Sequence, residues 1–106
     1  MVTFEDFKKL ELKIGKIIKV EEHSNAEKLY LLTIDLGDKQ IQLAAGIKPF
    51  YISSELEGKL VPVLVNLEPK NIRGVESQGM LLAAESKDDV SLLVSDKSVE
   101  PGSVVR

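Results

Sequence analysis

Short runs of alternating apolar and polar residues dominate this sequence, and they recur with Gly and Pro between them. An alternation with a period of two is typical of half-buried β-strands. Five runs of similar length show it, at residues 12–20, 29–37, 40–46, 60–67 and 79–85, and a shorter one follows at 90–94. Regular short strands with little helix predict an all-β barrel or sandwich. On this pattern alone the OB-fold, a five-stranded Greek-key barrel, is one candidate among several.

Helix is expected only in short pieces. Thr3 can cap a helix that presents Phe4 and Phe7 on one face. Ser24 and Glu27 have the spacing of a capping box, which predicts one helical turn there. One further turn fits within residues 47–58.

Glycine and proline predict irregularities in the strands. Gly15 indicates a bend or bulge in the first strand. Pro62 cannot donate to a ladder, which places the fourth strand at an edge or gives it a bulge. Val61, Val63, Val65 and Leu67 are expected to face the core. Residues 68–78 are predicted to form a long polar loop, and residues 37–39 a tight turn that closes a hairpin.

The charges exclude a strong, uniform attraction to nucleic acid. The chain has 14 Lys and Arg residues against 17 Asp and Glu residues, for a net charge of −3. Residues 39–73 nevertheless carry five cations and three acids, whereas residues 76–106 carry three cations and six acids. An anionic partner is therefore expected to contact the middle of the chain.

Most catalytic chemistry is missing from the sequence. There is no cysteine and a single histidine, His23, and no nucleophile elbow, phosphate loop or zinc motif accompanies it. We therefore expect neither an enzyme nor a bound metal or cofactor. No apolar run approaches the roughly 20 residues that a membrane helix needs, and the start MVTFEDFKK lacks a signal peptide's apolar stretch. These features predict a cytoplasmic protein that is not bound to membranes.

Three segments resemble the tRNA-binding OB domain family. HSNAEKLY (23–30) is similar to the signature H-P-x-A-D-K-L-Y, and NLEPKNIRGVESQGMLLAA (66–84) is similar to N-L-x-P-x-x-h-x-G-x-x-S-x-G-M-x-L-A. The opening DFKKLELKIGKI is similar to D-F-x-K-x-D-x-R-V-G-x-I. The resemblance spans essentially the whole chain. It departs at Ser24, where Pro is usual, at Glu27, where Asp is usual, and at Lys13, where Arg is common.

The resemblance implies a five-stranded OB barrel over residues 1–106, with a short N-terminal helix and a small extra C-terminal strand. Such domains bind the outer corner of tRNA by shape and phosphate contacts, lack catalysis and usually form symmetric homodimers. They occur at the C-terminus of methionyl-tRNA synthetases and as a free-standing beta subunit, which a chain of this length most resembles. The implied partners are therefore tRNA, the methionyl-tRNA synthetase catalytic subunit and a second copy.

Eight residues are the candidate RNA contacts. The loops after the first and fourth strands of an OB-fold commonly bind oligonucleotides, and these loops carry most of the candidates. They are Lys28, Lys70, Asn71, Arg73, Ser77, Met80, Lys48 and Asn25. Asn25 fits a structural role in its turn better than an RNA contact, Met80 fits the core equally well, and Lys48 is supported by charge alone.

Two other functions remain open on the sequence. The CsaA family of export-associated, chaperone-like proteins has the same fold and binds peptides, but its later loop diverges from the segment seen here. A structural domain that only tethers a synthetase is the other alternative. Aromatic residues make up only 5% of the chain, which argues against a groove that stacks successive bases. The two tyrosines, Tyr30 and Tyr51, are expected to be partly buried and not to act as stacking platforms.

Overall fold

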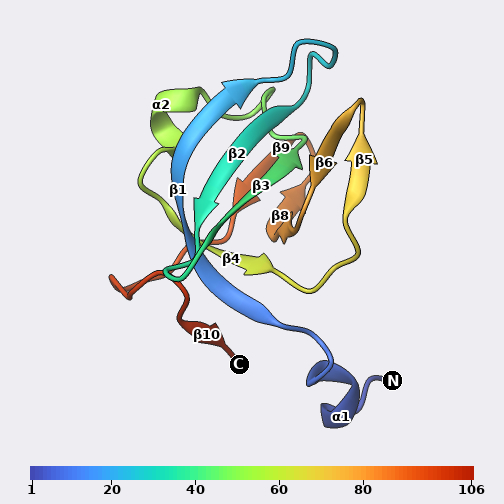
Figure 1. Ribbon diagram of the computed structural model, residues 1–106, viewed down its shortest axis with the longest axis vertical. Helices are drawn as coiled ribbons and strands as arrows, with labels where there is room; N and C mark the ends of the chain where they lie inside the picture. Colours follow the sequence, from blue (N-terminus) through green and yellow to red (C-terminus); the bar gives the residue numbers. More distant parts are fainter.

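The structure, a computed structural model, describes residues 1–106. One curved antiparallel sheet forms its centre, with the strand order β3-β2-β1-β4-β7 (Figure 1). The strands are β1 (Leu12–Glu22), β2 (Tyr30–Asp35), β3 (Gln40–Ala45), β4 (Leu60–Leu64) and β7 (Met80–Leu81). A short strand, β10 (Val104–Val105), pairs with the beginning of β1. The predicted all-β architecture is confirmed, but β10 lies in the C-terminal tail, where no strand was predicted.

Backbone and side-chain hydrogen bonds bring the two ends of this sheet together. Gln78 N donates to Gln42 O (2.8 Å), and Gln42 N donates to the Gln78 side chain (2.8 Å). The Ser77 hydroxyl accepts from Ala44 N (3.0 Å). These bonds join β3 to the segment that enters β7, so the sheet becomes a nearly closed five-stranded barrel. This is the OB-fold arrangement that the family resemblance implies.

In β2, β3 and β4 the interior of the barrel is filled by the alternate residues that the strand periodicity predicts. In β1 the alternation fails, because Ile17 is buried and Ile18, on the apolar side of the predicted strand, is 39% exposed. Ile17, Leu32, Ile34, Leu43 and Val63 have no exposed surface. β2 shows the alternation clearly, because every second residue from Tyr30 to Ile34 is buried. A continuous apolar core of this kind drives the closure of a small barrel.

The first strand curves around the barrel at a different residue from the one predicted. The register of β1 on β2 shifts between Ile17 and Lys19, whereas Gly15 pairs regularly with Val61. The prediction of a bulge at Gly15 is therefore wrong. Gly15 is required by packing instead, since a Cβ there would lie 2.3 Å from Ile34 Cγ2.

The fourth strand is shorter than predicted. β4 ends at Leu64, Val65 is half-buried, and Leu67 is exposed instead of facing the core. The chain leaves the sheet here because the Asn66 side chain binds the N-terminal segment. Its Oδ1 accepts from Glu11 N (2.9 Å), and its Nδ2 donates to Lys9 O (2.8 Å).

Pro62 causes no bulge in β4. It lies opposite Ile14 of β1, whereas the pairing of β4 with β7 is confined to Val63 and Leu64. β4 lies between β1 and β7, so the prediction of an edge strand is wrong. No residue of β7 pairs with Pro62, so its missing N–H interrupts no ladder on that side.

Two small hairpins lie outside the main sheet. Residues 68–78, predicted to be a loop, contain β5 (Lys70–Ile72) paired with β6 (Val75–Ser77). The predicted fifth strand is interrupted at Leu82, and its second half, β8 (Ala83–Ser86), pairs with β9 (Asp89–Leu92). Both hairpins stack beside the barrel, and the β5–β6 hairpin rises beside the loop between β1 and β2 (Figure 1).

The two helices are single turns. α1 (Phe4–Phe7) has the predicted Thr3 cap, which forms a capping box with Asp6. α2 (Ser53–Leu56) lies in the connection between β3 and β4 and buries Leu56 completely. The turn predicted at Ser24–Glu27 is not helical, because this segment forms two successive turns instead.

Candidate nucleic-acid interface

The loop between β1 and β2 is held closed around His23. This loop, residues 23–29, is called the β1–β2 loop below. His23 N donates to Leu29 O (3.4 Å), and His23 O accepts from Ala26 N (3.3 Å). Asn25 N donates to the ring nitrogen His23 Nδ1 (3.0 Å). The histidine thus performs the capping role that the sequence suggested for Ser24 and Glu27.

The same histidine reaches the neighbouring hairpin. Because Nδ1 accepts a hydrogen bond, the ring proton lies on Nε2, which donates to Ile72 O (3.3 Å). The side chain is buried, with 5% of its surface exposed, and both ring nitrogens have partners. The β1–β2 loop and the β5–β6 hairpin are therefore joined across 49 positions of sequence.

The hairpin presents Arg73 at its tip. Arg73 and Gly74 form a two-residue turn with φ values of 53° and 89°. Two left-handed residues in a two-residue hairpin loop define a type I′ turn, in which glycine is favoured at the second position. The Asn71 side chain accepts from Gly74 N (2.9 Å) and so stabilises the turn. Arg73 itself is exposed to solvent.

A surface hollow of about 560 Å³ lies between the two loops. It is lined by Asn25, Ala26, Glu27, Lys28, Leu29, Ile72 and Arg73. Lys28 and Arg73 supply two positive charges against the one negative charge of Glu27. The hollow is open, and both polar and apolar side chains line it. Its two cations suit it to a phosphate-bearing surface. We call it the cationic hollow.

Lys48 lies beside this hollow but is already paired. Its backbone N donates to Lys28 O (3.3 Å), and its ammonium forms an ion pair with the Glu22 carboxylate. The hydrogen bond to Glu22 raises the pKa of Lys48 above its usual value of 10.5. Glu22 thus partly neutralises the third cation near the cationic hollow.

The other candidates divide between the surface and the interior. Lys70 and Met80 are exposed, Met80 with 44% of its surface, so Met80 is not a core residue. Ser77 is buried, and its hydroxyl accepts from Ala44 N and donates to Gly79 O (3.3 Å). Ser77 therefore closes the barrel and does not belong to the exposed surface. Asn71 is exposed, but its Oδ1 serves the turn.

The tyrosines are structural, as predicted. Tyr30 is buried and its hydroxyl donates to Tyr51 O (2.7 Å). The half-buried Tyr51 in turn accepts from Leu92 N through its own hydroxyl (3.0 Å). Neither ring offers an open face on which successive bases could stack.

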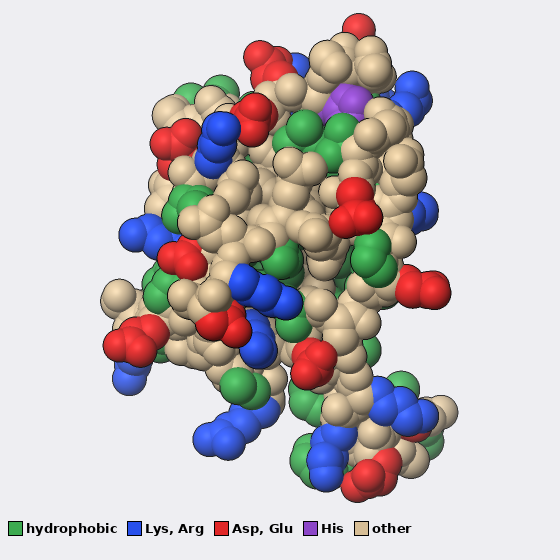
Figure 2. All heavy atoms as spheres, in the orientation of Figure 1, with side chains coloured by type: hydrophobic (Ala, Val, Ile, Leu, Met, Phe, Trp, Pro, Cys, Tyr) green, Lys and Arg blue, Asp and Glu red, His purple; other side chains and the backbone are tan.

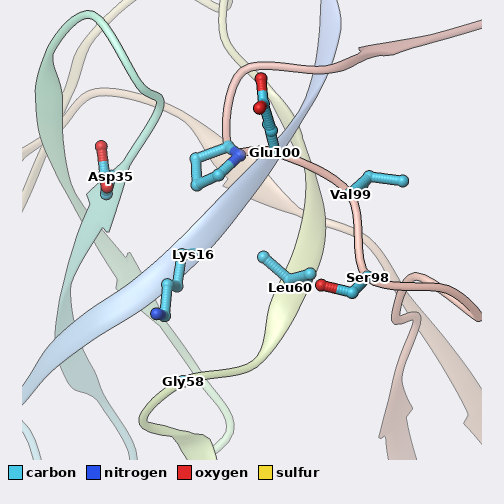
Figure 3. Close-up of a pocket in the computed structure, with 8 residues that line it drawn as sticks. Lys16, Asp35, Gly58, Leu60, Ser98, Val99 and Glu100 are labelled. Carbon is cyan, nitrogen blue, oxygen red and sulfur yellow. The ribbon is translucent and has the colours of Figure 1, made fainter.

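A second polar hollow is less suited to an anion. This hollow of about 510 Å³ is lined by residues of β1, β2 and the C-terminal segment, and it combines Lys16 with Asp35 and Glu100 (Figure 3). Acids outnumber cations there. No cluster of His, Asp and Glu could hold a metal ion, and no helix is long and apolar enough to cross a membrane.

Charged side chains of both signs are dispersed over the face shown in Figure 2, with no continuous basic surface. The single histidine lies near the end of the molecule formed by the β1–β2 loop, with basic side chains close by (Figure 2). Recognition of an anion must therefore depend on a few placed cations.

On the sequence alone, His23 is considered only for catalysis, and its hydrogen bond to Ile72 O is not predicted, because that partner lies in a distant hairpin. The position of His23 at the start of the HSNAEKLY segment was the available signal.

Comparisons with known proteins agree with this geometry. The family model described as "Putative tRNA binding domain" matches residues 12–104. The methionine–tRNA ligase of Pyrococcus horikoshii is 54% identical over 105 residues, which are 99% of this chain and 14% of that protein. The chain thus spans about one seventh of the length of such curated relatives.

Two solved structures share the fold over the whole chain. A MetRS-related protein from Pyrococcus horikoshii superposes with a TM-score of 0.94 and 36% identity, over 100% of this chain and 98% of that one. The chaperone CsaA from Bacillus anthracis superposes with a TM-score of 0.92 and 30% identity, over 100% and 99%. On the match to the family model and these likenesses, the chain belongs to the tRNA-binding domain family.

Proposed function

We propose that this chain binds tRNA through the cationic hollow and, without catalysis of its own, aids methionyl-tRNA synthetase in the cytoplasm. The observation that carries the proposal is that Lys28 and Arg73, from two separate loops, line one hollow. Separate cations on rigidly joined loops can contact phosphates that a bent RNA backbone brings close together. The association with the synthetase rests on the relatives, whose matching region is part of a methionine–tRNA ligase.

The other exposed candidates extend the contact surface around the hollow. Lys70 begins β5 and Arg73 lies at the tip of the same hairpin. Met80 offers an apolar contact to a sugar or base, and Asn25 lines the hollow. Lys48 contributes less because Glu22 holds it. Ser77 is left out of the proposal since its hydroxyl is used inside the barrel.

The number of cations limits the affinity of one copy. Three cations on this surface, Lys28, Lys70 and Arg73, are free of ion pairs. Neutralising three phosphates gives a slope of log affinity against log salt of about −2 to −3. One copy is therefore expected to bind weakly, and two linked copies would gain through effective concentration.

A second copy has a suitable surface on which to dock. Phe4, Phe7 and Leu10 of the N-terminal segment lie beside Val104 and line an apolar hollow of about 380 Å³. Phe4 and Val104 are each 70% exposed. Exposed apolar surface of this kind marks an interaction site, and we assign it to a homodimer.

The decisive experiment titrates total tRNA and a straight RNA duplex of equal length into the protein at several salt concentrations. The wild-type chain is expected to prefer tRNA. Arg73→Ala should reduce the salt slope by about 1 and weaken binding without loss of folding. Lys39→Ala is the matched control, because Lys39 is exposed in the β2–β3 turn, which lies at the other end of β2 from the β1–β2 loop. Equal binding of both RNAs, or no effect of Arg73→Ala, would refute the proposal.

The homodimer is tested by sedimentation. Val104→Lys is expected to shift the chain from dimer to monomer, because it replaces an exposed apolar side chain of the hollow with a third cation beside Lys8 and Arg106. Ile52→Lys is the control, since Ile52 is 64% exposed but lies beside α2. A monomeric wild-type chain would contradict the assignment.

Peptide binding is the second candidate function, and the similarity to the chaperone CsaA favours it. A denatured model protein titrated under the same conditions separates the two. Tight binding of that protein without retention of tRNA would reverse the choice.

A further inference from the structure

The β5–β6 hairpin is attached to the rest of the protein mainly at its base. The bonds that tie it to β3 come from Ser77, Gln78 and Glu76 O, at the end of β6 that leads into β7. Each strand of the hairpin has only three residues, and the two strands form a sheet of their own that is separate from the main sheet. A two-stranded hairpin of this length is marginally stable without further support.

At the tip of the hairpin, one hydrogen bond supplies that support. His23 Nε2–H to Ile72 O (3.3 Å) is the only hydrogen bond between the β1–β2 loop and the hairpin. The acceptor belongs to the residue directly before Arg73. The donor is a buried ring that the β1–β2 loop fixes through Asn25 N, so the bond joins a fixed partner to the hairpin tip.

We propose that His23 is a positioning residue that clasps the hairpin tip to the β1–β2 loop and so sets the spacing between Lys28 and Arg73. The inference rests on the proposed function, because that function gives the spacing its importance. His23 itself touches no RNA, since its side chain is buried and both ring nitrogens are engaged within the protein. It acts only through Arg73.

Two amide substitutions separate the two hydrogen bonds of the ring. The side-chain amide nitrogen of Gln occupies about the position of Nε2, so His23→Gln can still donate to Ile72 O. The side-chain oxygen of Asn occupies about the position of Nδ1, so His23→Asn can still accept from Asn25 N but does not reach the hairpin. The pair therefore distinguishes the clasp from the internal structure of the β1–β2 loop.

The expected results follow from that difference. His23→Asn should bind tRNA about tenfold more weakly, the loss expected when one charge-assisted contact is no longer held in place. His23→Gln should stay within about threefold of the wild-type affinity. In an Arg73→Ala background, His23→Asn should add less than a twofold further loss, because its effect passes through Arg73. Equal losses in both variants, a larger loss in His23→Gln, or additive losses with Arg73→Ala would overturn the clasp.

A measurement without RNA keeps the inference separate from the proposed function. Backbone order parameters from ¹⁵N relaxation at Arg73, Gly74 and Val75 should fall from the rigid range near 0.85 towards 0.6 in His23→Asn, but not in His23→Gln. Unchanged order at the tip in His23→Asn would overturn the clasp even if tRNA binds. Absence of tRNA binding by the wild-type chain, with the expected change in order, would refute the proposed function and leave the clasp in place.

Discussion

Substitution of Ser77 by Ala tests whether the Ser77 hydroxyl holds the barrel closed or contacts RNA. The change removes the acceptor of Ala44 N–H (3.0 Å) and the hydroxyl that donates to Gly79 O (3.3 Å). Ser77 is 5% exposed, so water does not readily replace the lost partner. A buried donor left without an acceptor costs about 1–3 kcal/mol. The missing oxygen is smaller than a methyl group, so the cavity adds little.

The assay is urea unfolding with a parallel thermal melt. The free energy of unfolding of Ser77→Ala is expected to fall by about 1–3 kcal/mol with an unchanged m-value. In a chain of this size the melting temperature should fall by at least about 4 °C. Ser91→Ala is the matched control, because Ser91 is exposed on β9 and its hydroxyl makes no hydrogen bond; its effect should stay within about 0.5 kcal/mol.

The tRNA affinity of the same variant completes the test. Under conditions where Ser77→Ala is fully folded, its affinity should equal that of the wild-type chain, since the hydroxyl points into the barrel. Undiminished stability would show that this hydroxyl does not hold β3 and β6 together. Undiminished stability combined with a loss of tRNA affinity would return Ser77 to the RNA surface and refute the reasoning.

Two further predictions concern the surroundings of the cationic hollow. Gly74→Ala leaves room for the added Cβ but forces a residue with φ of 89° to carry a side chain. It should cost about 1–2 kcal/mol in the hairpin and reduce the hydrogen-exchange protection of its amides, whereas Gly46→Ala, at ordinary φ, should not. Glu22→Gln removes the carboxylate charge of the partner that raises the Lys48 pKa, and it leaves at most a weaker hydrogen bond to a neutral amide oxygen. The Lys48 ammonium should therefore titrate at lower pH, as followed by NMR, and tRNA affinity at neutral pH should increase. In the wild type the stabilisation by this pair is present below pH 10.5 and is lost as pH rises through the higher pKa of the folded state. An unshifted titration in Glu22→Gln would contradict that origin of the shift.

The barrel was predictable because its strands are long enough to show a period. β2 and β3 alternate over six residues each, and a glycine turn separates them. β5 and β6 have three residues each, too few for alternation to stand out. Their turn also uses Arg-Gly in place of the common Asn-Gly, so the hairpin was predicted to be a loop. Because β6 has only three residues, its sequence also shows no alternation from which the burial of Ser77 could be predicted.

The composition of the site was easier to predict than its assembly. Lys28 and Arg73 were identified from their loops and their motifs, and the structure places both at one hollow. The bond that joins their loops links positions 49 apart in the sequence. No periodicity or spacing rule connects His23 to Ile72, because the contact exists only after the barrel has closed. The pairing of Lys48 with Glu22 depends on the fold in the same way, so the charge of Lys48 in the sequence could not show that it is paired.

The proposed dimer surface and the cationic hollow lie at opposite ends of the barrel. This arrangement allows two weak RNA sites to act together. The apolar residues of α1 and β10 lie at one end, and the β1–β2 loop and the tip of the β5–β6 hairpin lie at the other (Figure 1). β1 joins the two ends with eleven residues, a path of about 35 Å. A second copy docked on α1 and β10 therefore leaves both cationic hollows open, and each hollow supplies only two cations, Lys28 and Arg73. Binding of one tRNA by two such hollows depends on the dimer. Val104→Lys should then weaken tRNA binding although it touches no RNA, and an unchanged affinity in a proven monomer would show that a single hollow suffices.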